Sequence, residues 1–336
     1  MIKEAINMLV NNINLSENEM AECMKEIMEG KATDSQIASF LTALRIKGET
    51  VDEITGAAKI MREKATKIKA PEGVLDTCGT GGDMSHTFNI STTTAFVVAG
   101  AGVPVAKHGN RSVSSQSGSA DVLEALGIKI DLEPEKVEKC LFQTGFGFLF
   151  APLFHPAMKY AIGPRREIGI RTIFNILGPI TNPAEAKRQI LGVFTEKLTN
   201  TLAQVLGNLG TLDAIIVHGE DGLDEVSITG KTKISRYKNG MVENFIIEPE
   251  DFGIWRSGIE SIKGGKKEEN ALITTSILKG EKSPKREIVL LNSALALIAA
   301  GRTEDFKTAY DMAAESIDSG MAIKKLEEVK KVSNAL

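Results

Sequence analysis

This chain is best understood from one segment, Asp76-Thr-Cys-Gly-Thr-Gly-Gly-Asp-Met-Ser-His-Thr-Phe-Asn-Ile-Ser-Thr92. It places Gly79, Gly81 and Gly82 within four positions, and an apolar run follows at residues 95–101. Glycines let the backbone turn tightly and approach a ligand closely. A helix that begins behind such a loop points unpaired N–H groups at an anion. The segment therefore predicts a phosphate or pyrophosphate site. The aspartate after the glycines indicates that a cation or a sugar hydroxyl belongs to the ligand.

Size and composition narrow the class of protein. The chain has 336 residues, enough for one large α/β domain or for two domains. Its net charge is −4, whereas a general nucleic-acid binder usually carries a basic stripe, so we expect no nucleic-acid partner. No apolar run approaches the ~20 residues of a membrane span, so we expect no membrane association. Three scattered cysteines fit a reducing compartment and predict a cytoplasmic protein.

Residues 1–70 and residues 74–336 differ in the secondary structure that their sequence patterns predict. Residues 1–70 predict a small helical domain, to which residues from about 155 to 175 add a later helical contribution. From residue 74 to residue 336, strand-like runs alternate with helical ones, which is typical of a mostly parallel sheet covered by helices. We therefore predict an α/β protein with a small N-terminal helical domain and a larger α/β domain. Three capping boxes support the helical domain: Ser16 with Glu19, Thr33 with Gln36, and Thr50 with Glu53.

Polar loops follow three of the predicted strands, at residues 79–83, 107–120 and 218–225. Ligands of open parallel sheets bind outside the carboxyl ends of the strands, so these loops are expected to share one edge. The second loop supplies cations and a row of hydroxyls, which suit phosphate oxygens. The third ends in Asp224-Glu225, a pair that suits Mg²⁺ beside a diphosphate. Taken alone, each loop also fits a solvated surface.

Three arginines follow His155 in an otherwise apolar and glycine-rich segment. They indicate recognition of a carboxylate, although at least one of them is expected only to form an ion pair with Glu167. Two nucleotide-binding classes are disfavoured, because no Walker lysine follows the glycines and the Rossmann spacing is absent.

A series of short motifs runs along nearly the whole chain: Gly79-Thr-Gly-Gly-Asp83, Asn89-Ile-Ser-Thr92, Lys107-His-Gly-Asn-Arg111, Gly118-Ser-Ala-Asp-Val-Leu-Glu-Ala-Leu-Gly127, Phe148-Leu-Phe-Ala-Pro152, His155-Pro-Ala-Met158, Gly169-Ile-Arg-Thr-Ile-Phe-Asn175, Leu177-Gly-Pro179 and Asp224-Glu225. In their order and number, these motifs resemble those of the anthranilate phosphoribosyltransferase family. Two positions depart from the family pattern. Met84 stands where glycine is usual, and Pro164 stands directly before Arg165, whereas the family's proline usually lies two residues before that arginine.

The resemblance implies transfer of the phosphoribosyl group from phosphoribosyl diphosphate to the amine of anthranilate, in tryptophan biosynthesis. It also implies a homodimer formed through the helical domain. It assigns Mg²⁺ to Ser91, Asp224 and Glu225, and anthranilate to Gly79, Asn110 and Arg165. The residues that it assigns to phosphoribosyl diphosphate are Gly79, Gly82, Asp83, Thr87, Asn89, Ile90, Ser91, Thr92, Lys107, His108, Gly109, Asn110, Arg111, Ser112, Val113, Ser114, Ser115 and Ser119.

Two other functions share the predicted fold. A pyrimidine nucleoside phosphorylase binds inorganic phosphate and needs no Mg²⁺ at an acidic pair, so Asp224-Glu225 argues against it. A non-enzymatic, nucleic-acid-binding relative is expected to show a basic face and a degraded anthranilate site. The net charge of −4, together with the presence of Asn110 and Arg165, argues against that alternative.

Overall fold

A computed structural model describes residues 1–83, 85–112 and 116–336. Met84, Val113, Ser114 and Ser115 lie outside the described residues, and so do the predictions made for them. Within the described part of the chain, no helix has the length and apolar character needed to cross a membrane.

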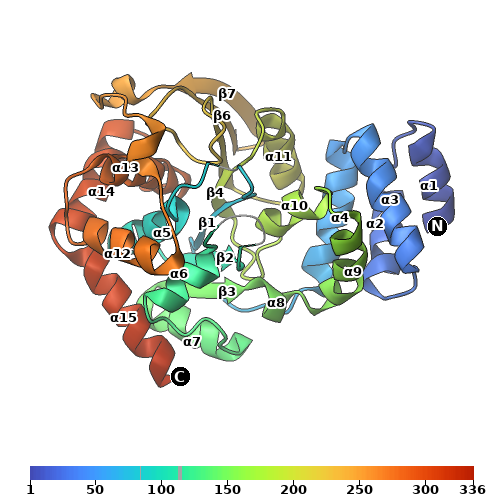
Figure 1. The fold of residues 1–336 in the computed structure, drawn as a ribbon, viewed down its shortest axis with the longest axis horizontal. Helices are drawn as coiled ribbons and strands as arrows, with labels where there is room; N and C mark the ends of the chain where they lie inside the picture. The colour runs from blue at the N-terminus through green and yellow to red at the C-terminus, as the bar shows by residue number, and fades with distance from the viewer. Residues whose placement is uncertain (84, 113–115) are drawn as a thin grey trace.

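Four helices form the N-terminal part of the molecule, and Figure 1 shows them grouped at one end, around the N-terminus. The three predicted capping boxes are confirmed, since Ser16, Thr33 and Thr50 each accept from the backbone of the third helical residue. A later helix, α9 (Lys159–Ile168), packs against α2 and α3 and contains Pro164. The four helices are α1 (Ile2–Val10), α2 (Glu17–Met28), α3 (Asp34–Lys47) and α4 (Val51–Lys64).

One seven-stranded sheet forms the centre of the rest of the molecule, with the strand order β3-β2-β1-β4-β5-β6-β7. Strands β1 to β5 run parallel, and the last two pair antiparallel, as the mostly parallel sheet predicted from the sequence requires. The strands are β1 (Leu75–Gly79), β2 (Val105–Gly109), β3 (Phe146–Phe150), β4 (Arg188–Gly192), β5 (Asp213–Gly219), β6 (Thr232–Lys238) and β7 (Met241–Ile247).

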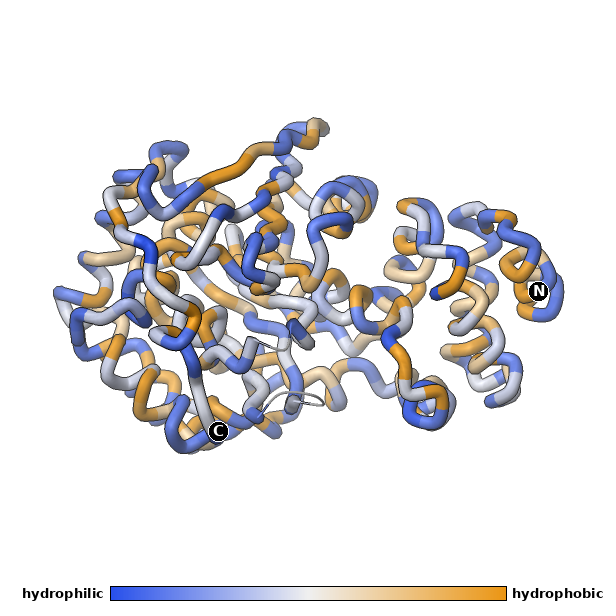
Figure 2. The backbone as a smooth tube through the Cα atoms, turned by 45° about the horizontal axis from the view of Figure 1, so that its top comes forward, coloured by the Kyte–Doolittle hydropathy of each residue, from blue (hydrophilic) through white to orange (hydrophobic). Residues whose placement is uncertain are grey.

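Helices cover both faces of this sheet (Figure 1). Apolar side chains of successive strand residues enter different cores: Ile215 belongs to the core that includes α5 and α13, whereas Ile216 belongs to the core that includes α11 and the N-terminal helices. Figure 2 shows apolar and polar stretches alternating along the helices. The remaining helices are α5 (Ile90–Gly100), α6 (Ser119–Ala125), α7 (Pro134–Thr144), α8 (Ala151–Phe154), α10 (Phe174–Leu177), α11 (Lys197–Asn208), α12 (Lys267–Leu278), α13 (Pro284–Ala299), α14 (Phe306–Asp318) and α15 (Met321–Ala335), with 3-10 turns η1 (Pro156–Met158), η2 (Gly178–Ile180), η3 (Pro249–Phe252) and η4 (Ile259–Ile262).

The strand order reverses between β1 and β4, because β1 connects to β2 on one side while β4 leads to β5 on the other. Such a switch point is where ligands of open α/β sheets bind, outside the carboxyl ends of the strands. The glycine loop, residues 79–83, follows β1 directly. The three polar loops expected at one edge therefore follow β1, β2 and β5, which are all parallel.

Candidate active site

The glycine loop lies against the acidic pair. Gly81 N donates to Asp224 Oδ2 at 2.7 Å, although 143 positions separate the two residues. A Cβ on Gly79 would lie 2.5 Å from the same carboxylate oxygen, so only glycine allows this approach. Gly81 and Gly82 have φ values of +65° and +72°, a region that favours glycine. The loop and the acidic pair thus form a single site.

The beginning of α5 joins the same site. Ser91 N donates to Glu225 Oε1 at 3.1 Å, and Ser91 Oγ accepts from Lys107 Nζ at 3.3 Å. The Lys107 side chain is buried and also donates to the carbonyl of Thr77. Backbone N–H groups at a helix start, a lysine and two carboxylates therefore meet at the switch point. This arrangement suits an anion that arrives together with a divalent cation.

Charges crowd together in this site. Burial, and after it the neighbouring Asp83, raise the pKa of Asp224 to about 7. Burial and then Asp224 raise the pKa of Glu225 well above its ordinary value. Burial lowers the pKa of Lys107, although nearby carboxylates, Asp76 first, act in the opposite direction. A divalent cation would relieve the repulsion among the carboxylates, so this donor set fits Mg²⁺. Among the described residues, no group of three or more histidine, cysteine or acidic side chains is placed to hold a metal ion.

Several other predicted phosphate ligands have partners within the protein. Asn89 Nδ2 donates to the carbonyl of Ser117 at 3.1 Å, and Asn89 Oδ1 accepts from Asn270 at 3.0 Å. The Arg111 guanidinium pairs with Asp121 and Glu124, each at 2.8 Å. These contacts order both phosphate loops, whereas the sequence patterns indicated only ligand contacts.

The remaining predicted ligands lie on the same elements. The side chains of Ile90 and Thr92 are buried in the first turn of α5, where Thr92 Oγ1 has no partner among the described residues. Gly109 ends β2. Thr87 forms a β-bridge with Lys263, and Ser112 N donates to Asp121 Oδ2 at 3.1 Å. The Ser119 hydroxyl donates to the carbonyl of Asn110 at 3.3 Å.

The three arginines of the segment after His155 have different surroundings. Arg165, on α9, is half-buried and lies 5.1 Å from the centre of the Phe174 ring. Burial lowers its pKa, and within the described part of the chain no carboxylate pairs with it. Arg166 is exposed. The expectation that one of them forms an ion pair with Glu167 is wrong for the described residues, because the side chains stack on rings or face solvent.

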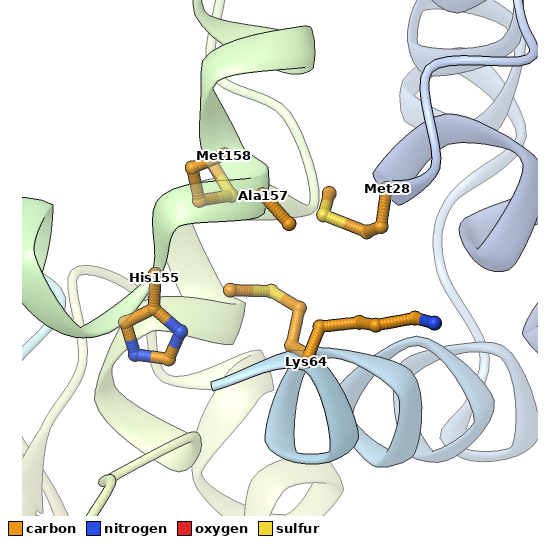
Figure 3. A pocket seen from close by; sticks show the side chains of 6 residues that line it. Met28, Lys64, His155, Ala157 and Met158 are labelled. Atoms are coloured by element: carbon orange, nitrogen blue, oxygen red, sulfur yellow. The ribbon is translucent and has the colours of Figure 1, made fainter. Parts of the chain in front are cut away.

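Two buried histidines lie beside the site. His108 on β2 shares a 3.0 Å hydrogen bond with the carbonyl of Gly178, and its ring centre lies 5.0 Å from that of His155. His155 also lines a small pocket between the N-terminal helices and η1. Figure 3 shows His155 and Met158 on one side of this pocket, and Lys64 and Met28 on the other. Among the described residues that line this pocket, none is predicted to bind a substrate or Mg²⁺.

His155 is expected to make the fold sensitive to acid. Burial lowers its pKa from 6.5 to about 4, so the unfolded chain binds a proton at a higher pH than the folded chain does. Stability present above pH 6.5 is therefore lost as the pH falls towards 4. His155→Gln should reduce this loss by roughly 3 kcal/mol, since 1.36 kcal/mol corresponds to one pKa unit. Urea unfolding of both proteins across this pH range tests the prediction, and parallel pH profiles would contradict it.

The comparisons with known proteins agree with this geometry. The helical bundle domain of a glycosyl transferase family matches residues 3–65, and the a/b domain of that family matches residues 71–323. An anthranilate phosphoribosyltransferase of Acetivibrio thermocellus is 56% identical over 336 residues, covering 100% of this chain and 97% of the relative. The crystal structure of the Thermus thermophilus enzyme has a TM-score of 0.93 at 40% identity, and the match covers 98% of this chain and 99% of that one. The chain belongs to the anthranilate phosphoribosyltransferase family.

A more distant anthranilate phosphoribosyltransferase, from Saccharomyces cerevisiae, has been solved with ligands. Its complex with PRPP (phosphoribosyl diphosphate) and Mg has a TM-score of 0.91 at 29% identity, covering 100% of this chain and 98% of that one. Its complex with 4-fluoroanthranilate has a TM-score of 0.90 at 28% identity, with the same coverage. The predicted family, fold and enzyme class are confirmed, and these relatives support neither the nucleoside phosphorylase nor the nucleic-acid-binding alternative.

Membership of the anthranilate phosphoribosyltransferase family does not by itself identify the residues that support the loops. Asn270, Arg171 and Phe194 escaped the sequence interpretation of ligand sites. The sequence places Arg171 among the three arginines and within the motif Gly169–Asn175 but indicates no contact with the glycine loop, and no local pattern marks Asn270 or Phe194. Their contacts join positions that are far apart along the chain.

Proposed function

We propose that the loops at the carboxyl edge of the sheet bind phosphoribosyl diphosphate and Mg²⁺, and that Arg165 holds anthranilate for attack on the ribose. The observation that carries this proposal is the contact of the glycine loop with Asp224, beside Ser91, Glu225 and Lys107. It joins a phosphate-binding loop to a cation-binding acidic pair. The yeast relative binds PRPP and Mg, which supports the same ligands here.

In this proposal, the diphosphate lies against the glycine loop and the first turn of α5. The Lys107 ammonium and N–H groups of these elements would stabilise the charge that develops on the leaving diphosphate, except for Gly81 N and Ser91 N, which donate to Asp224 and Glu225. Ser91, Asp224 and Glu225 would hold Mg²⁺, with substrate oxygens and water completing its coordination. Bound there, the ion neutralises diphosphate oxygens and supplies Lewis acidity. The other residues that the family resemblance assigns to the sugar diphosphate, on residues 79–92 and 107–119, keep those roles as proposals.

Arg165 is proposed to recognise the anthranilate carboxylate. It is a half-buried cation without an acidic partner in the described part of the chain, so a ligand carboxylate would supply the missing charge. The Asn110 side chain accepts from Arg111 N at 2.8 Å through Oδ1, which leaves its amide N–H groups for a ligand. Gly79 would contact both substrates. The yeast relative's complex with 4-fluoroanthranilate supports a site for this class of compound.

The aniline nitrogen is already neutral near pH 7, so it needs little deprotonation before it attacks. The bond between the anomeric carbon and the diphosphate oxygen breaks while the nitrogen forms a new bond on the opposite face, which inverts that carbon. The nitrogen, positively charged once the new bond has formed, then releases one proton to water or to the departing diphosphate, and we assign no general base.

Product formation tests the proposed function. The protein is mixed with anthranilate, phosphoribosyl diphosphate and Mg²⁺, and the coupled product and free pyrophosphate are both measured. We expect them to form in equal amounts. Omitting Mg²⁺ should stop the reaction. Phosphorolysis of uridine or thymidine without metal, in the absence of transferase activity, would overturn the proposal.

We also propose that the chain forms a homodimer through its N-terminal helices and works in the cytoplasm. Three apolar side chains in this region are more than half exposed, those of Val10, Ile13 and Ile46. Such exposure supports a surface that a second copy of the chain covers. Light scattering of the purified protein measures the oligomeric state.

A further inference from the structure

We propose that Arg171 is a positioning residue, whose guanidinium fixes the glycine loop between Gly82 and the ring of Phe194. The inference rests on the proposed function, in which this loop holds the diphosphate. Arg171 lies between α9, which carries Arg165, and α10. No residue role assigned above explains its place beside the loop.

The geometry around Arg171 is specific. Its Nη2 donates to the carbonyl of Gly82, and its Cζ lies 4.4 Å from the centre of the Phe194 ring. A Cβ on Gly82 would lie only 3.0 Å from Nη2, so the guanidinium packs directly on the glycine backbone. An arginine that stacks on an aromatic face and donates to a carbonyl uses two properties that lysine lacks, a planar face and a fixed fork of donors.

Other hydrogen bonds fix Thr80 and Gly81, whereas Gly82 is held by Arg171. Thr80 Oγ1 accepts from Phe194 N at 3.0 Å, and Gly81 N donates to Asp224 at 2.7 Å. These bonds fix the loop before Gly82, whereas Arg171 holds Gly82 itself. Because Gly82 has no side chain to restrict its backbone, losing Arg171 would let this part of the loop sample conformations that do not bind the ligand.

Within the described part of the chain, Arg171 forms no ion pair with a carboxylate. Arg171 can therefore act on ligand binding in two ways: its charge attracts a polyanion over a distance, or its contacts fix the loop. These are separable, because lysine retains the charge while losing the stacked plane, and Phe194→Leu removes the ring without changing any charge.

Calorimetric titration with phosphoribosyl diphosphate and Mg²⁺ tests the proposal without relying on turnover. The proteins are wild type, R171K, F194L, the double variant R171K/F194L, and R166K as a control on an exposed arginine of the same segment. We expect Kd to rise about tenfold in R171K and in F194L, since hydrogen bonds to charged groups and cation–π contacts contribute energies of this order. The double variant should bind about as weakly as R171K alone, because the Phe194 ring acts only through the guanidinium that R171K has already removed. R166K should bind like wild type.

Kinetics provide the second measurement. The KM for phosphoribosyl diphosphate should rise with Kd, while kcat and the KM for anthranilate at a saturating sugar donor change less than about threefold. Wild-type affinity in R171K, or independent additive losses in the double variant, would overturn the positioning role. A wild-type protein that binds the sugar diphosphate but forms no product would overturn the proposed function alone, because the binding data still decide the role of Arg171.

Discussion

The double variant Asp224→Asn, Glu225→Gln is expected to lose at least about a hundredfold in kcat/KM at fixed Mg²⁺, because both anionic ligands proposed for the ion are removed. Its fold should survive. The introduced amide oxygens can still accept from Gly81 N and Ser91 N, the two backbone donors that the carboxylates bind now. Removing the two carboxylates also relieves an electrostatic cost, because burial raises the pKa of both groups, Asp83 adds to the rise at Asp224, and Asp224 adds to the rise at Glu225.

Activity and stability are therefore expected to move in different directions in this variant. Its melting temperature without ligands should equal or exceed that of wild type, a relation typical of functional sites. Mg²⁺ with phosphoribosyl diphosphate should raise the melting temperature of wild type only. Glu220→Gln, which changes an exposed carboxylate of the same loop, is the matched control. An Mg²⁺ titration of activity that is the same in the double variant and in wild type would remove Asp224 and Glu225 from the metal site.

The predicted elements that the structure confirms depend on short-range signals. A capping box joins residues three positions apart, so Ser16 with Glu19, and Thr50 with Glu53, were readable from the sequence. The glycine loop is predictable for the same reason, because its glycines are close together in the sequence. Strand β3, residues 146–150, was not predicted, because its side chains are nearly all buried and show no polar alternation.

The parts of the site that escaped prediction depend on long-range contacts. Asn270 contacts Asn89 across 181 positions, and Arg171 contacts Gly82 across 89. Such pairings follow from strand order, which one sequence does not specify. For Arg111, the sequence indicated a phosphate ligand, yet its guanidinium forms ion pairs on α6. An exposed ion pair contributes only about 0–1 kcal/mol, so it does not prevent Arg111 from turning to a ligand, and its predicted role stays a prediction.

Arg165→Ala should raise the KM for anthranilate by about ten- to a hundredfold, the loss expected for a charge-assisted hydrogen bond of roughly 1.5–3 kcal/mol. The KM for phosphoribosyl diphosphate should change far less, since that ligand is proposed to bind the loops after β1 and β2. The folded protein should also keep or gain stability, because the substitution removes a half-buried cation whose charge no carboxylate balances within the described part of the chain.

Comparing two acceptors makes the Arg165 experiment specific for the carboxylate. Aniline lacks the carboxyl group of anthranilate, so wild type should use aniline poorly, and Arg165→Ala should discriminate little between the two amines. The neighbouring Arg166→Ala changes an exposed arginine of the same helix and should behave like wild type. If Arg165→Ala instead raised the KM of both substrates equally, the loss would reflect general damage to the site. If the variant still preferred anthranilate over aniline as strongly as wild type does, another cation would have to hold the carboxylate, because discrimination follows the contact that the weaker acceptor lacks.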